Sequence, residues 1–325
     1  MRALVLTALV LMATGAATPS PHWSVTDPGQ GPVSLPQGDT PARELGGITW
    51  DSGTRYYAVS DKLGTVFPLS IELNRRDGTI GHASIAPGIL LPGSTDLEGV
   101  AVDRAHATVL VSDEVGPTIR EYRLADGRLV RSISVPAVYR TARTNLSLES
   151  LSLAPDRPNL WAANEETLVR DGPLSSAEGG SVVRLQRFDA ERPAGQWAYV
   201  TDPLLGDILR EGRDIESSGV ADVVALPGGG LLVLERAFGA GGLRNRLYEV
   251  DFAGATDVAA LPSLAGATYQ PVHKRLLWEH RFTDINYEGA ALGPQLADGG
   301  YSLILISDDG HHQRQALYAL VVRRR

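Results

Sequence analysis

Short apolar segments recur along the chain in a fixed order. One repeat consists of an apolar strand, a turn, a second strand and a polar pair at the end of that strand. The five copies begin at Gly46, Glu98, Glu149, Ala221 and Glu288. The polar positions that close them are Asp61, Asp113, Asn164, Glu235 and Asp308. A further apolar segment follows each copy, so each repeat contains at least three predicted strands.

Repeats that start roughly fifty to seventy residues apart, with several short strands in each, are typical of the blades of a β-propeller. Turn signals such as Asp77-Gly78 separate the predicted strands. We therefore predict an all-β chain folded as a β-propeller with six blades, or five as the alternative. The sixth blade would lie within residues 196–215 or be completed by residues 22–45. No linker interrupts the pattern, so residues 18–325 are predicted to form a single domain.

The first residues have the pattern of a signal peptide. Arg2 supplies a positive charge, residues 3–13 form an apolar stretch, and small residues follow as far as Ala17. We expect cleavage near Ala17, which makes residues 1–17 the signal peptide and the mature protein secreted or periplasmic. No later apolar stretch approaches the length of about 18 residues that a membrane span requires.

Composition excludes several classes of function. A formal net charge of −8 argues against a nucleic-acid-binding protein, which normally carries a basic face. The chain has no cysteine, which excludes disulfide bonds, a lipoprotein anchor and thiolate chemistry. The G-x-S-x-G motif of α/β-hydrolases is also missing, which disfavours a serine esterase of that fold.

Candidate chemistry comes from the repeated acidic positions. The inner strands of a propeller point toward a central channel, so a residue type that recurs at one blade position forms a ring. Glu98, Glu149 and Glu288 share the first position of their repeats. Carboxylates gathered at one channel mouth repel one another unless a cation neutralises them, and Ca²⁺ is suited to such oxygen ligands. The predicted calcium ligands are Glu98, Asp113, Glu149, Asn164, Glu288 and Asp308.

A simpler interpretation stands beside this one. An acidic side chain at a fixed blade position can be a turn former that caps backbone N–H groups, repeated because the blade is repeated. The three glutamates fit that interpretation less well, because turns favour Asp, Asn or Ser and strand starts rarely carry Glu. The sequence leaves both interpretations open.

Four segments of the sequence also carry a resemblance to a known family. They are Asp96-Leu97-Glu98-Gly99-Val100-Ala101, Leu148-Glu149-Ser150-Leu151-Ser152, Leu234-Glu235-Arg236-Ala237-Phe238 and Asn286-Tyr287-Glu288-Gly289-Ala290. Together with Ser307-Asp308-Asp309, these segments resemble the phytase-like family of bacterial exported proteins, which is described as having esterase-like activity. The resemblance extends over residues 43–322 and implies hydrolysis of phosphate esters such as phytate.

The acidic ring and the resemblance together predict an exported, metal-dependent phosphoesterase that acts on a small anionic ester as a monomer. Its metal ion would neutralise phosphate oxygens and activate a water molecule, while Arg236 or Lys62 steadies the ester. The predicted catalytic residues are Glu98, Glu149, Glu288 and Arg236. Two alternatives remain. One is a non-catalytic binding module of the cell envelope that uses loops such as residues 171–180, and the other is a calcium-dependent hydrolase of the lactonase type.

Overall fold

The computed structural model describes residues 22–36, 39–204, 217–239, 242–282, 285–308, 310 and 315–325. The expected signal peptide, residues 1–17, and Asp309 lie outside these ranges. Within them, no helix is long and apolar enough to cross a lipid bilayer.

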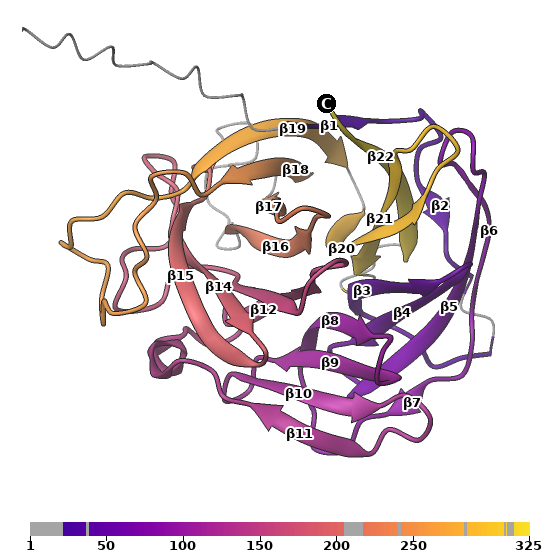
Figure 1. The fold of residues 1–325 in the computed structure, drawn as a ribbon, viewed down its shortest axis with the longest axis horizontal. Coiled ribbons are helices and arrows are strands. Elements are labelled where there is room, and N and C mark those ends of the chain that lie inside the picture. The colour runs from indigo at the N-terminus through magenta and orange to yellow at the C-terminus, as the bar shows by residue number, and fades with distance from the viewer. Residues whose placement is uncertain are drawn as a thin grey trace, which may run out of the picture.

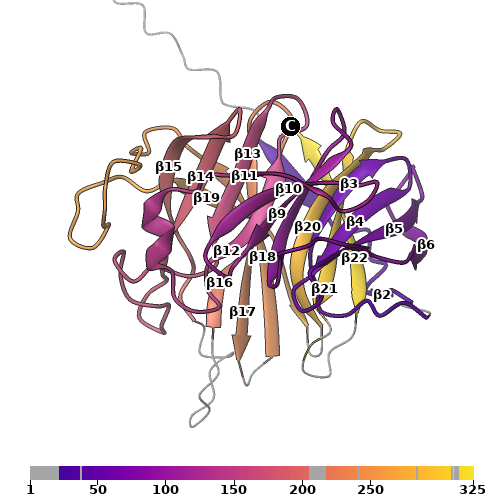
Figure 2. The ribbon, with the colours of Figure 1, turned by 90° about the horizontal axis from the view of Figure 1, so that it is seen from below.

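Five antiparallel sheets surround a central channel, which confirms the predicted β-propeller (Figure 1). The strands nearest the channel are β3 (Leu45–Ser52), β8 (Leu97–Asp103), β12 (Leu148–Leu153), β16 (Ser217–Ala225) and β20 (Asn286–Gln295). They open blades 1 to 5 in chain order. Seen from the side, the strands run between the two ends of the propeller (Figure 2).

The remaining strands complete the blades outward. The second strands are β4 (Arg55–Ser60), β9 (Thr108–Asp113), β13 (Asn159–Asn164), β17 (Leu231–Gly239) and β21 (Tyr301–Asp308). The third strands are β5 (Thr65–Leu73), β10 (Thr118–Arg123), β14 (Val182–Asp189), β18 (Gly242–Asp251) and β22 (Ala316–Arg324). The outermost strands are β6 (Ile80–Ile85), β11 (Leu129–Ile133), β15 (Arg192–Val200), β19 (His273–Phe282) and β1 (Trp23–Thr26). Short strands β7 (Ile89–Leu90) and β2 (Val33–Ser34) add to blades 1 and 5, and a 3₁₀ helix, η1 (Ala137–Thr141), follows β11.

The blade count is five, the alternative, rather than the six that the sequence favoured. The described parts of both segments considered for a sixth blade belong to other blades or to the loops beside them, and residues 205–215 lie outside the described ranges. Residues 196–200 form the end of β15, which pairs with β14 as the outer strand of blade 3. Strands β1 and β2 pair with β22 and so complete blade 5 from the N-terminal side. The chain therefore closes its ring by joining its two ends within one sheet.

The apolar core lies between the blades. One cluster of buried side chains fills each of the five interfaces between neighbouring blades. Leu110 and Leu151, for example, meet between blades 2 and 3. A strand covered on both faces needs apolar side chains in both directions, and every residue of β9 is buried. This explains why the second strands appear in the sequence as nearly continuous apolar runs.

Two long loops are fixed against blade 3 by one buried arginine. Arg184 of β14 forms a forked ion pair with Asp171, with Nε–Oδ2 and Nη2–Oδ1 distances of 2.6 and 2.8 Å. Its Nη1 atom donates to Oε1 of Gln196 at 2.5 Å, and its Nη2 atom donates to the carbonyl of Leu261 at 3.1 Å. Asp171 also accepts a hydrogen bond from the backbone N–H of Leu264. The loop after β13 and the loop between β18 and β19 are thus held by one buried network.

Candidate functional site

A β-bulge near the start of each inner strand determines where the repeated glutamates point. The pairing between β12 and β13 shifts register between Leu148 and Ser150, which leaves Glu149 without a partner across the sheet. The pairing of β8 with β9 shifts register at Glu98, and the pairing of β20 with β21 shifts register at Glu288, so these two residues also lack a partner across the sheet. A bulge bends its strand and redirects the unpaired residue. All three glutamates lie on the wall of one cavity at this end of the channel.

Close contact between neighbouring inner strands brings these glutamates near one another. A Cβ atom on Gly47 would lie 2.2 Å from the carbonyl oxygen of Glu98 in the next blade. A Cβ atom on Gly99 would lie 2.4 Å from the backbone nitrogen of Leu151. Only glycine permits backbones to approach so closely. The glycines at the second position of their repeats, Gly47 and Gly99, therefore let neighbouring blades converge at the channel.

The cavity at this end of the channel has a volume of about 530 Å³. We call its charged wall the acidic mouth. The residues that define it are Glu44, Asp61, Lys62, Glu98, Glu114, Glu149, Glu165, Arg236, Glu288 and Asp308. The set includes five residues of the predicted site, namely Glu98, Glu149, Arg236, Glu288 and Asp308. The predicted convergence of side chains from distant repeats at one mouth is therefore present.

Two of the predicted metal ligands lie away from the cavity. Asp113 forms an ion pair with Arg120 at 2.8 Å and accepts backbone hydrogen bonds. Oδ1 of Asn164 accepts the backbone N–H of Arg184 at 2.9 Å. Both side chains are buried and make contacts within their own blades.

The residues that follow these two positions line the acidic mouth instead. Glu114 comes directly after Asp113, and Glu165 comes directly after Asn164. Glu114 and Glu165 lie one residue beyond the ends of β9 and β13, where the chain leaves its blade at the mouth. The second member of the polar pair that closes each repeat was therefore the signal in the sequence that could have identified them as site residues.

Among the residues that the structure describes, three carboxylates of the mouth have no side-chain cation bound to them. Oxygen atoms of Glu98, Glu114 and Glu149 lie within 4.8 Å of one another. Glu149 is only 8% exposed, and among the described residues its side chain has no hydrogen bond or ion pair. Burial and then the charges of Glu288 and Glu114 raise the pKa of Glu98 well above its usual range. Burial, followed by the charge of Glu98, does the same to the pKa of Glu149, and burial raises the pKa of Glu114 to about 7.

The opposite side of the mouth is neutralised by Arg236. Its guanidinium pairs with Glu165 at 2.5 Å and with Glu288, so it joins blades 3, 4 and 5. Asn286 also donates to Glu288 through Nδ2 at 2.6 Å. The Arg236 side chain is 15% exposed. Arg236 is therefore a bridge between two carboxylates, whereas the sequence had suggested a cation that contacts the ester.

The chemistry of the unneutralised group suits a hard divalent cation. Three carboxylates offer six oxygen atoms, which matches the preference of Ca²⁺ for about six to eight oxygen ligands. The mouth contains no histidine or cysteine among its described residues, so softer metals such as zinc find no favoured ligand there. Burial is the main cause of the raised pKa values, and the charges of neighbouring carboxylates add to it.

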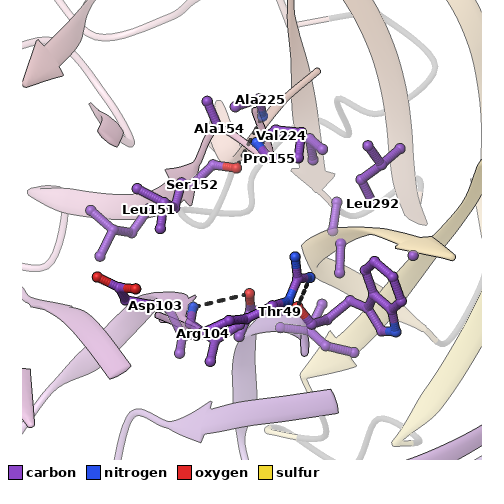
Figure 3. Close-up of a pocket in the computed structure, with 18 of the residues that line it drawn as sticks. Thr49, Asp103, Arg104, Leu151, Ser152, Ala154, Pro155, Val224, Ala225 and Leu292 are labelled. Atoms are coloured by element: carbon purple, nitrogen blue, oxygen red, sulfur yellow. Dashed lines mark hydrogen bonds between the residues drawn. The ribbon is translucent and has the colours of Figure 1, made fainter. Parts of the chain in front are cut away.

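The other end of the channel has a different character (Figure 3). Its cavity of about 250 Å³ is lined largely by apolar side chains. The hydroxyl groups of Thr49 and Ser152 accept backbone N–H groups of the next blade, at 3.3 and 3.0 Å. Arg104 donates to the carbonyl of Trp50 and lies over its ring. Polar groups at this end are thus engaged in fixing the blades, and the end with free carboxylates is the candidate site.

Comparison with known proteins identifies the family. The profile described as "Phytase-like: Esterase-like activity of phytase" matches residues 40–311. The chain belongs to the phytase-like family. No curated protein sequence matches this phytase-like chain.

Three solved structures that resemble the phytase-like chain do so only distantly. Aldose sugar dehydrogenase from Streptomyces coelicolor, in its PQQ-bound form, is 13% identical with a TM-score of 0.47, covering 94% of this chain and 100% of that one. An endo-arabinase from Bacteroides thetaiotaomicron is 10% identical with a TM-score of 0.49, covering 88% and 96%. Hydrazine synthase from Kuenenia stuttgartiensis is 12% identical with a TM-score of 0.39; 84% of this chain is covered, but only 58% of that one. Similarities this low carry no argument about chemistry.

Proposed function

We propose that this phytase-like chain is a divalent-cation-dependent hydrolase of small anionic phosphate esters, with its site at the acidic mouth. The observation that carries the proposal is the group formed by Glu98, Glu114 and Glu149, whose oxygens lie within 4.8 Å of one another and which no cationic side chain in the described ranges neutralises. The description of the family supports ester chemistry. Calcium is the proposed ion because all of the donors are carboxylate oxygens.

Because the acidic mouth is negatively charged, the proposed reaction requires a bound cation. A phosphate ester approaching uncompensated carboxylates would be repelled. Glu98, Glu114 and Glu149 would hold the cation, which in the bound state supplies a Lewis acid for the phosphoryl oxygens and lowers the pKa of a water molecule. We expect a dissociation constant of about 10⁻⁴–10⁻³ M, as in extracellular calcium modules.

Two residues beside the three carboxylates, Lys62 and Asp61, would bind the ester and transfer protons. Lys62 is 49% exposed, far more than Arg236, and its ammonium is the cation that can reach the anionic ester. A proton leaves the attacking water and another must reach the departing alcohol, so a carboxylate is needed as acceptor and donor. Asp61 lies within 4.8 Å of Glu98 and has a buried Oδ1 atom without a hydrogen-bond partner. We assign the proton transfer to Asp61.

The test compares Glu149→Gln with a matched change at the other end of the channel. The calcium-free protein is assayed for release of phosphate or p-nitrophenol from a phosphate monoester and a carboxylate ester, before and after Ca²⁺ is added. We expect calcium to restore phosphate release and Glu149→Gln to lower it by about 100-fold or more, since it removes a metal ligand. Asp103→Asn changes a carboxylate in the apolar cavity and should leave the rate unchanged.

Two results would reject the proposal. Full turnover in Glu149→Gln would show that the group is not the site. An absence of turnover on every ester, with calcium changing only the melting temperature, would make the carboxylate group structural. The protein would then be better described as a binding module.

A further inference from the structure

Glu98 belongs to two groups of carboxylates at once. In the first group its oxygens lie within 4.8 Å of those of Glu114 and Glu149, and in the second they lie within the same distance of Asp61 and Asp96. The first group contains Glu149, which is buried and has no side-chain partner in the part of the chain that the structure describes. Two adjoining sets of ligand atoms that share one carboxylate have the arrangement of a pair of cation sites.

A side chain of the protein already brings a positive charge to the second group. The Lys62 ammonium lies 2.5 Å from Oδ2 of Asp61 and 3.7 Å from Glu44. A lysine side chain carries its positive charge at neutral pH, so the ammonium acts as a counter-ion for these carboxylates. The other oxygen of Asp61, Oδ1, is buried and has no hydrogen-bond partner, so this carboxylate has an unused ligand atom.

We infer that the mouth contains two adjoining cation sites and that the ammonium of Lys62 fills the second, so that the protein takes one divalent ion. This inference rests on the proposed function, because it assumes that Glu98, Glu114 and Glu149 bind the first ion. In the wild-type chain the second site, formed by Asp61, Asp96 and Glu98, is occupied by the ammonium of Lys62. A change that removes the ammonium exposes it to solvent cations.

The two sites would present different kinds of positive charge to an ester. A bound divalent ion coordinates oxygen atoms directly, whereas an ammonium donates hydrogen bonds and carries one charge. Lys62 has three N–H donors, and one is used by Asp61. Glu44 lies 3.7 Å from the same ammonium, and a further donor would bind an anionic group held beside Glu98. The inferred ligand of the mouth is therefore an anion placed between one divalent ion and one ammonium.

Calorimetric titration with Ca²⁺ tests the inference through the number of ions bound. We expect one ion in the wild type, two in Lys62→Met and one in Lys62→Arg, which keeps the charge. Lys62 is half exposed, so these variants should fold, and circular dichroism checks that they do. Asp96→Asn in the Lys62→Met background removes a ligand of the second site and should return the number to one.

The possible failures can be told apart. Two ions in the wild type, or one in Lys62→Met, would overturn the role of Lys62 and leave the first site and the proposed function intact. No ion in the wild type would reject the proposed function, and the inference with it. Two ions in the double variant would show that the second ion binds somewhere other than at Asp61, Asp96 and Glu98, which also overturns the inference.

Discussion

Glu114 offers the sharpest test of the acidic mouth, because its protonation is linked to folding. The side chain is 7% exposed, and burial raises its pKa from 4.5 to about 7. One of its oxygens, Oε1, accepts the backbone N–H of Ser147. In Glu114→Gln the amide oxygen keeps this acceptor and the shape of the side chain, while the charge is lost. The substitution therefore isolates the effect of ionisation.

The direction and size of the effect follow from the pKa. A carboxyl group whose folded-state pKa is raised stabilises the fold below its unfolded pKa, and that contribution is lost as the pH rises through the folded-state pKa. Each pKa unit corresponds to about 1.4 kcal/mol, so a pKa raised from 4.5 to about 7 corresponds to a loss of at most about 3 kcal/mol between pH 4.5 and pH 8 in the metal-free protein. Glu114→Gln does not suffer this loss.

Thermal unfolding in the presence of a chelator measures the difference. We expect equal melting temperatures at about pH 4 and a melting temperature for Glu114→Gln that is higher by up to about 6 °C at about pH 8, taking about 2 °C per kcal/mol for a chain of this length. Added calcium should reverse the order, because the wild type binds the ion more tightly. The reasoning is refuted if the two proteins show the same pH dependence without calcium, or if the wild type becomes more stable as the pH rises.

Three further substitutions test the fold that carries the site, each by urea denaturation. Asp171→Ala leaves the buried guanidinium of Arg184 without its counter-ion and should lower the free energy of unfolding by about 3–5 kcal/mol. Gly47→Ala places a Cβ atom 2.2 Å from the carbonyl of Glu98, and we expect a loss of about 3 kcal/mol or more with weakened calcium binding. Trp23→Ala removes a buried ring from the strand that closes the propeller and should cost about 3–5 kcal/mol.

Matched controls separate these effects from general damage. Asp126→Ala breaks an exposed ion pair and should change the free energy of unfolding by less than about 1 kcal/mol. At Gly81 an added Cβ atom meets only an ordinary contact at 3.7 Å, so Gly81→Ala should be nearly neutral. Thr26→Ala alters an exposed position of the same strand as Trp23. A control as damaging as its partner would contradict the corresponding explanation.

The propeller could be predicted because each blade repeats a local pattern of short apolar strands and turns. The number of blades could not, because it depends on a long-range pairing. Strand β1 is four residues long and becomes part of a blade only through its contact with β22 at the other end of the chain. Nothing in its local sequence distinguishes it from a loop or from the start of a separate blade.

The candidate site, like the fold, could be predicted from the sequence only in part. The recurrence of Glu98, Glu149 and Glu288 correctly predicted that the three would converge, since equivalent blade positions meet at the channel. The pairing of Arg236 could not be read from the sequence, because its partners Glu165 and Glu288 lie 71 and 52 positions away. Which side chains are free and which are neutralised depends on these distant contacts, and the proposed chemistry depends on that distinction.

The closure of blade 5 by both chain ends has a consequence for the order of folding. The hydroxyl group of Ser24 donates to the carbonyl of Arg323 across a separation of 299 positions. Closing a loop of that length costs about 3 kcal/mol more than closing one of ten residues. The ribosome makes β1 long before β22, so blades 1 to 4 can form while β1 has no partner strand. Until β22 is made, β1 is an unpaired strand that can pair with other chains.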